Sequence, residues 1–279
     1  MEPRGLLELT RPVNAVVAGV LTLIGAFVAG GLTGPGRALV PAAAAALATV
    51  LAVAAGNAVN DYFDRDIDRV NAPDRPIPRG AVSPRAALAF SGVLFAVAVA
   101  LALTLPLVAI AIAVVNLLAL VAYTELFKGL PGVGNAVVAY LGGSTFLFGG
   151  AAVGEPLTAG VLAALAALST LARELIKDVE DIDGDRQEGL NTLPIAVGER
   201  PALVVALVAL ALAVAASPLP YLTGTLGVAY LVAVIPGDAV MLGAAVEAFG
   251  DPGAGQRHMK YGMFLAAAAF VVGRVGVLV

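Results

Sequence analysis

The chain has no cysteine, no tryptophan and a single histidine, and charged side chains make up only 13% of its 279 residues. The absence of cysteine excludes disulfides and thiol chemistry. The lone His258 cannot build a histidine-rich metal site. Without tryptophan the sequence lacks a common marker of the membrane interface, so the ends of apolar segments are located only to within several residues. The net charge of −4 gives no sign of nucleic-acid binding, and we expect no nucleic-acid partner.

Apolar residues dominate the chain, at 60% of the sequence, and the mean hydropathy is +0.95. No ordinary water-soluble domain has this composition. Runs close to the length of a bilayer-spanning helix recur from end to end, and the 32 glycines suit close helix packing in lipid. We therefore predict an all-α polytopic membrane protein with one domain over residues 1–279. Its nine expected spans are residues 13–32, 38–60, 86–105, 107–124, 133–153, 157–177, 201–219, 222–247 and 261–279.

Polar loops are expected at 61–85, 125–132, 178–200 and 248–260, and Pro236 predicts a kink or break in the eighth span. With nine spans, the N-terminus and these four loops share one side of the membrane. That side holds every lysine and arginine except Arg37 and Arg274. The positive-inside rule predicts that it is the cytoplasmic side of a cell membrane.

The pattern DxxDxxxD occurs twice, each time where a long apolar run meets charged sequence. The first copy lies within residues 60–68 and the second within 177–185, and each aspartate of the second lies 117 positions after its counterpart. The matched spacing indicates a pseudo-repeat of two functional halves. The six aspartates are Asp61, Asp64, Asp68, Asp178, Asp181 and Asp185.

Carboxylates at positions i, i+3 and i+7 share one face of a helix, where they repel one another unless a cation binds. Mg²⁺ held by a few carboxylates takes its remaining ligands from water and substrate phosphates. The six aspartates are therefore the predicted ligands of Mg²⁺. The alternative for any one of them is a solvated loop charge, but that reading does not explain two copies with the same spacing.

Such metal clusters beside basic residues suit a diphosphate, because Mg²⁺ and cationic side chains together neutralise its charge. A diphosphate at the mouth of an apolar bundle indicates a lipid tail inside it, and an allylic cation formed there needs shielding and aromatic faces. The alternative roles are topology signals for the basic residues, helix–helix hydrogen bonds for the asparagines and packing for the tyrosines. The predicted substrate-binding residues are Asn14, Asn60, Arg65, Arg75, Lys128, Lys177, Tyr123 and Tyr140.

These motifs resemble those of the UbiA superfamily of intramembrane prenyltransferases. The matching strings are Asn60-xxx-Asp64-xxx-Asp68, Asp181-xxx-Asp185, and the segments 74–78 (DRPIP) and 192–195 (TLPI). The resemblance implies nine transmembrane helices around a central cavity, a Mg²⁺ cofactor, and transfer of a prenyl group from a prenyl diphosphate to a lipid or aromatic acceptor. We expect catalytic roles for Asp64, Asp68, Asp181 and Asp185.

Within the superfamily, the strings at 128–131, 134–139, 148–150 and 173–181 are similar to archaeal enzymes of ether-lipid synthesis. This resemblance implies a geranylgeranyl donor and geranylgeranylglyceryl phosphate as the acceptor. Arg79 and Asn191 depart from the usual pattern and bear on the acceptor.

Two other functions stay open at this point. One is prenylation of an aromatic acceptor such as 4-hydroxybenzoate, although the five arginines of 65–85 favour an anionic acceptor. The other is transport of a divalent cation or metabolite, which would place acidic residues near the middle of the membrane. Only Asp238 lies well inside a predicted span, so the sequence favours the enzyme.

Overall fold

The computed structural model describes residues 2–33 and 37–278, and every regular element in those ranges is helical. The elements, in chain order, are α1 (Pro3–Leu9), α2 (Pro12–Val28), α3 (Leu39–Phe63), α4 (Arg65–Asn71), α5 (Pro84–Ala102), α6 (Leu107–Ala122), the π-helical turn η1 (Tyr123–Phe127), α7 (Val133–Ala152), α8 (Pro156–Glu180), α9 (Ile182–Gln187), α10 (Leu193–Val197), α11 (Glu199–Ala216), α12 (Leu219–Leu222), α13 (Val228–Glu247) and α14 (Pro252–Leu278).

The predicted all-α polytopic class is confirmed. Seven of the described helices are long and apolar enough to cross a membrane, and the count is eight when α1 and α2, bent by 51°, are taken as one span. Each of the nine predicted apolar segments contains a long helix. Among these nine helices, α7 is the one that the count of candidate spans leaves out. Its 20 residues form an unbroken helix, but its glycine, serine and asparagine residues lower its mean hydropathy.

Helix α1, which is not among the predicted elements, precedes the first span. Two details of the sequence prediction were wrong. Helix α14 begins at Pro252, within the loop expected at 248–260. Helix α13 runs without a break through Pro236. A Cβ on the adjacent Gly237 would lie 3.0 Å from the backbone nitrogen of Ala266, so the α13 and α14 backbones are in close contact, and this packing holds the helix together despite the proline. Residue 279 of the last predicted span lies outside the described residues.

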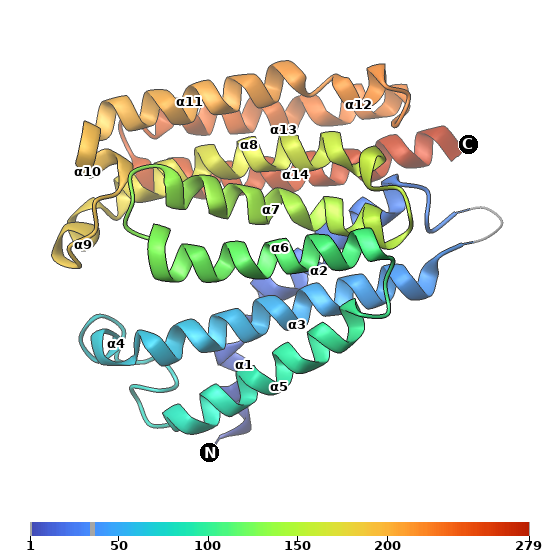
Figure 1. Cartoon of the computed structure of the whole chain (residues 1–279). Coiled ribbons are helices and arrows are strands. Elements are labelled where there is room, and N and C mark those ends of the chain that lie inside the picture. The colour runs from blue at the N-terminus through green and yellow to red at the C-terminus, as the bar shows by residue number, and fades with distance from the viewer. Residues whose placement is uncertain (1, 34–36, 279) are drawn as a thin grey trace.

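The long helices run roughly side by side, with α7 and α8 in the middle of the bundle (Figure 1). Helices α3 and α5 pack together on one side of this pair, and α11, α13 and α14 lie on the other. The short helices α4 and α9, which continue the two aspartate motifs, project from the same end of the bundle. The fold therefore brings both motifs to one end, as the span count predicted.

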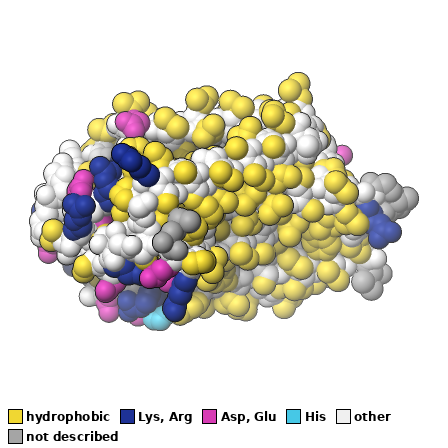
Figure 2. All heavy atoms as spheres, turned by 90° about the horizontal axis from the view of Figure 1, so that it is seen from below, with side chains coloured by type: hydrophobic (Ala, Val, Ile, Leu, Met, Phe, Trp, Pro, Cys, Tyr) yellow, Lys and Arg dark blue, Asp and Glu magenta, His cyan; other side chains and the backbone are white. Residues whose placement is uncertain are grey.

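Charged side chains gather at that end, and a broad apolar surface covers the rest of the face shown in Figure 2. Helix α6 illustrates this surface, because only 6% of its most apolar stretch is buried within the protein. A helix that is apolar all round but exposed is stable only if lipid covers it. The exposed apolar belt thus agrees with a membrane location.

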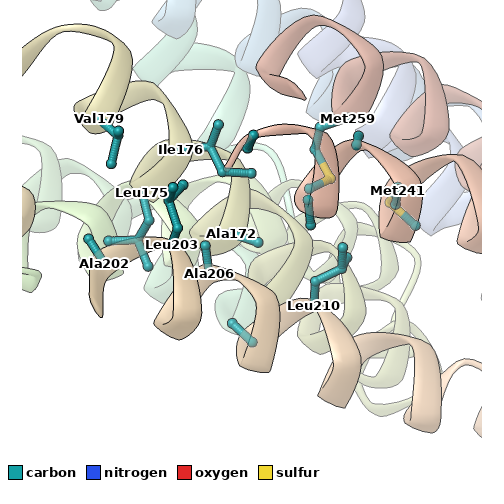
Figure 3. Packing of buried hydrophobic residues seen from close by; sticks show 14 residues of the cluster. Ala172, Leu175, Ile176, Val179, Ala202, Leu203, Ala206, Leu210, Met241 and Met259 are labelled. Atoms are coloured by element: carbon teal, nitrogen blue, oxygen red, sulfur yellow. The ribbon is translucent and has the colours of Figure 1, made fainter. Parts of the chain in front are cut away.

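A buried cluster of apolar side chains fixes the rotation of α8 near the second motif (Figure 3). Leu175, Ile176 and Val179 of α8 pack there against α11, α13 and α14. Because residues three and four apart share a helix face, this packing turns Lys177 and Asp178 away from the cluster. The core thereby orients the polar side of α8 toward α7.

Candidate active site

The middle aspartate of each motif lies where a long helix gives way to a short one. Asp64 follows the end of α3 and precedes α4, and Asp181 occupies the same place between α8 and α9. The prediction of one continuous helix face for each motif was therefore wrong in detail. The last aspartates, Asp68 and Asp185, lie in the first turns of α4 and α9, where negative charge is favourable.

In the first motif, Asp61 and Asp68 both converge on the guanidinium of Arg75. Arg75 Nη1 lies 2.5 Å from Asp68 Oδ2 and 3.7 Å from Asp61 Oδ1. Both aspartates are buried, and Asp64 is half-buried beside them. Burial by itself would lower the pKa of Arg75, but the hydrogen bond to Asp68 and the negative charges of Asp68, Asp61 and Asp64 outweigh it and raise that pKa. These carboxylates thus face a common cation.

A second arginine, Arg11, donates from Nη2 to Asp61 Oδ1 at 2.7 Å. Among the described residues other than glycine, Arg11 alone has a positive φ, of 45°. It lies at the bend between α1 and α2. The following Pro12 disfavours the right-handed helical conformation at this position. The proline therefore ends α1, and the ion pair with Asp61 holds the bend against α3.

In the second motif, Asp178 and Asp181 have different partners. Asn135 of α7, itself buried, donates from Nδ2 to Asp178 Oδ2 at 2.8 Å. Lys177 Nζ donates to Asp181 Oδ2 at 2.7 Å. Asp185 has a raised pKa, chiefly because it is partly buried and also because of the nearby charge of Asp181.

Lys128 lies close to this second motif. It is exposed, and its charge acts on Asp185 together with that of Lys177. Its loop contacts the segment after α9, where the backbone N–H of Asn191 donates to the carbonyl of Gly129 at 3.2 Å. The structure therefore gathers the predicted Lys128 and Lys177 with the three aspartates.

Among the described residues, no three aspartate, glutamate, histidine or cysteine side chains are grouped closely enough to form a metal site by themselves. The donor chemistry still fits Mg²⁺, which is commonly held by one or two carboxylates with water and substrate phosphates as the other ligands. Asp61 and Asp68 supply two carboxylates that already face one cation.

The other predicted substrate residues are spread more widely. Asn60 lines a pocket beside the first motif, and Asn14 lines a second pocket. Tyr123 lies near the second motif, within reach of the charges of Lys177 and Asp178. The roles predicted for Arg65 and Tyr140 stay predictions. Arg65 donates to the Tyr62 carbonyl and lies over the Tyr62 ring, and Tyr140 is exposed on α7 and lines neither pocket.

Two apolar pockets lie on either side of α7. The pocket beside the first motif, of about 420 Å³, is bounded by α3, α5, α6 and α7. The second, of about 360 Å³, is bounded by α2, α7, α8, α13 and α14. Thr145 of α7 lines both. This arrangement offers apolar space for two lipid tails below one charged end.

The predicted site residues do not include Arg11 or Asn135. Arg11 binds an aspartate 50 positions away in the chain, and Asn135 binds one 43 positions away. As an amide within a predicted apolar span, Asn135 is a candidate from the sequence, but only the structure shows that its partner is Asp178. No sequence pattern pairs Arg11 with Asp61.

Residues 18–268 match the profile of the UbiA prenyltransferase family. A digeranylgeranylglyceryl phosphate synthase from Natronomonas pharaonis is 64% identical over 276 residues, which cover 99% of this chain and 98% of the relative. A solved structure of digeranylgeranylglyceryl phosphate synthase superposes with a TM-score of 0.82 at 32% identity and 98% coverage of both chains. A UbiA homolog from Archaeoglobus fulgidus bound to GPP and Mg²⁺ has a TM-score of 0.68 at 18% identity, covers 99% of this chain and all of the homolog, and shows likeness of fold alone.

Proposed function

The chain belongs to the UbiA prenyltransferase family, and we propose that it transfers a geranylgeranyl group from geranylgeranyl diphosphate to geranylgeranylglyceryl phosphate in archaeal ether-lipid synthesis. The family resemblance read from the motifs is thereby confirmed. The observation that carries the specific reaction is the identity of 64% over nearly the full length to a digeranylgeranylglyceryl phosphate synthase. Two apolar pockets below one charged end agree with a reaction between two lipid-tailed substrates.

We propose that the two aspartate motifs hold Mg²⁺. The structure of the Archaeoglobus fulgidus homolog is that of a protein bound to GPP and Mg²⁺, which supports a role for the ion. Asp61, Asp64 and Asp68 would serve one ion, and Asp178, Asp181 and Asp185 another. When bound, Mg²⁺ would supply positive charge that offsets the negative charge of the departing diphosphate. Since Arg75 pairs with Asp61 and Asp68, it lies where it can bind the diphosphate oxygens that a metal leaves open.

The other proposed roles follow from position. Lys128 and Lys177 lie at the second motif and would orient the diphosphate. Asn60 lies at the mouth of the pocket beside the first motif, where the prenyl tail would enter. The apolar walls of that pocket would exclude water from the allylic cation until the acceptor hydroxyl oxygen attacks. The hydroxyl proton would pass to a motif carboxylate or to the released diphosphate.

The membrane arrangement is also part of this proposal. Helix α7 would be the ninth span, between α6 and α8, and the two pockets would form the central cavity around it. The charged end with both motifs would face the cytoplasm, because lysine and arginine concentrate there. The proposed domain organisation is a single unit in which α3–α4 and α8–α9 are equivalent halves.

The test is prenyl transfer by the purified protein in detergent, with labelled geranylgeranyl diphosphate. Geranylgeranylglyceryl phosphate and 4-hydroxybenzoate are offered in separate reactions, each with and without Mg²⁺. We expect product only from the glyceryl phosphate and only with Mg²⁺. Product from the aromatic acid alone would keep the family and overturn the acceptor. If neither gave product and no prenyl diphosphate bound, the transfer reaction would be rejected in favour of transport.

Asn135 gives a prediction about the second motif. Replacing it with alanine removes the hydrogen bond that orients Asp178. Groups that orient metal ligands typically contribute about 10–100-fold to metal affinity or activity. We expect Asn135→Ala to raise the Mg²⁺ concentration for half-maximal activity by about that factor, measured by titrating Mg²⁺ at fixed substrate. The exposed Asn71 provides the matched control, and an unchanged Mg²⁺ requirement in Asn135→Ala would remove Asn135 from the site.

A further inference from the structure

The pocket bounded by α2, α7, α8, α13 and α14 differs from the one beside the first motif in what lies at its mouth. Two cationic side chains, Arg173 and Lys260, line it near the charged end. Among the described residues, no lysine or arginine lines the pocket beside the first motif. The two pockets therefore offer different chemistry to the head groups of two substrates.

Aromatic side chains line this pocket at the end away from Lys260. Phe270 packs edge-on against Phe146, with ring centroids 5.7 Å apart, and is stacked on Tyr230 at 5.8 Å. The Tyr230 hydroxyl donates to the carbonyl of Ser217 at 2.7 Å, and the Ser217 hydroxyl donates to Asp238 Oδ2 at 2.7 Å, so these polar groups of the pocket wall are paired with one another. Lys260 and Phe270 are ten residues apart on α14, which corresponds to a depth of about 15 Å.

At the mouth, Arg173 has a donor without a partner. Its Nη1 binds Glu174 at 2.5 Å and its Nη2 binds Gln256 at 3.0 Å, but its buried Nε has no hydrogen-bond partner within the described structure. A buried unpaired donor is costly unless a ligand or water satisfies it. Lys260 has no carboxylate within 4.0 Å among the described residues, so its charge is not taken up by an ion pair.

We propose that this pocket binds the acceptor, with its tail between the helices and its phosphate at Arg173 and Lys260. The inference rests on the proposed function and specifies which substrate each pocket takes. A phosphate monoester is bound well by arginine and lysine without a metal. The diphosphate donor has the aspartate motifs for its metal, and the pocket beside Asn60 for its tail. Thr145 of α7 lies between the two tails.

The first test is the kinetics of Lys260→Ala. Loss of a charged hydrogen bond to the phosphate is expected to raise the KM for geranylgeranylglyceryl phosphate by about 10-fold or more. The KM for geranylgeranyl diphosphate is expected to stay within about twofold. Arg257→Ala is the matched control, because Arg257 is exposed on the same helix and lines neither pocket, and it should change neither KM.

The second test is a thermodynamic cycle, in which the phosphate is removed from the ligand, the charge of Lys260 is removed from the protein, and both are removed together. Calorimetry without donor or Mg²⁺ compares geranylgeranylglyceryl phosphate with geranylgeranylglycerol, which lacks the phosphate. The unaltered protein should bind the phosphate form about 10-fold more tightly or better, and Lys260→Ala should lose most of this preference.

The outcomes separate this inference from the proposed function. An active protein in which Lys260→Ala raises the donor KM instead, or weakens both calorimetric ligands equally, would overturn the acceptor pocket alone. No transfer to the glyceryl phosphate by the unaltered protein would overturn the proposed function and this inference with it.

Discussion

Replacing Asp64 or Asp181 with alanine is expected to lower kcat/KM by more than about 100-fold, because each lies at the centre of a proposed metal motif and direct ligands contribute more than the groups that orient them. Both aspartates occupy the same position, between a long helix and a short one. The measurement is Mg²⁺-dependent transfer of labelled geranylgeranyl by purified protein.

Each of these variants has a matched control within its own motif. Asp66 and Asp183 are exposed and pair only with neighbouring arginines, Asp66 with Arg69 at 3.1 Å and Asp183 with Arg186 at 3.5 Å. Such exposed pairs contribute little to stability, so alanine at either position should leave activity within about twofold. Gel filtration and the thermal midpoint check that all four variants remain folded. Full activity in both Asp64→Ala and Asp181→Ala would rule out the metal assignment.

Gly149→Ala is expected to destabilise the protein strongly, because α2 and α7 touch at this glycine. A Cβ on Gly149 would overlap the carbonyl oxygen of Thr22, and one on Gly25 of α2 would overlap the carbonyl oxygen of Phe146. Both obstacles are backbone atoms, which cannot rotate away as a side chain can. Overpacking typically costs about 1–3 kcal/mol, which corresponds to a thermal midpoint lower by roughly 3–10 °C.

Gly160→Ala is the control for this substitution, since a Cβ there would meet no atom within 4 Å. Alanine is otherwise favoured over glycine in a helix, so this variant should be as stable as the unaltered protein or more so. The thermal midpoints are measured by unfolding in detergent. Equal midpoints for Gly149→Ala and Gly160→Ala would show that the α2–α7 contact is looser than the structure has it.

The predictions that succeeded were those that rest on local patterns. Each expected apolar segment contains a long helix, and the spacing of the aspartate motifs identified the family. The predictions that failed concern where helices begin and end. Pro236 stays inside a helix because α13 packs closely on α14, and Asp64 and Asp181 interrupt what was expected to be a continuous helix face.

Among the predicted site residues, the charged ones next to the motifs were located best. Arg75 and Lys177 lie at the aspartates because only a short stretch of chain separates each from its motif. Lys128 lies near the second motif because its loop contacts the segment after α9. Arg65 was predicted as a basic neighbour of the first motif and Tyr140 as an aromatic residue of a span, and neither lines a pocket.

The sequence by itself determined that this is a membrane protein, that its two aspartate motifs belong together, and that it is a prenyltransferase of the UbiA family. Those properties follow from hydropathy, charge placement and spacing along the chain, which do not depend on how helices rotate against one another. The tertiary structure alone decided that Arg11 binds Asp61, that Asn135 binds Asp178, and that two pockets with different mouths flank α7. These contacts join residues far apart in the chain, and they exist only because small residues such as Gly149 let the helices approach at one rotation and one depth.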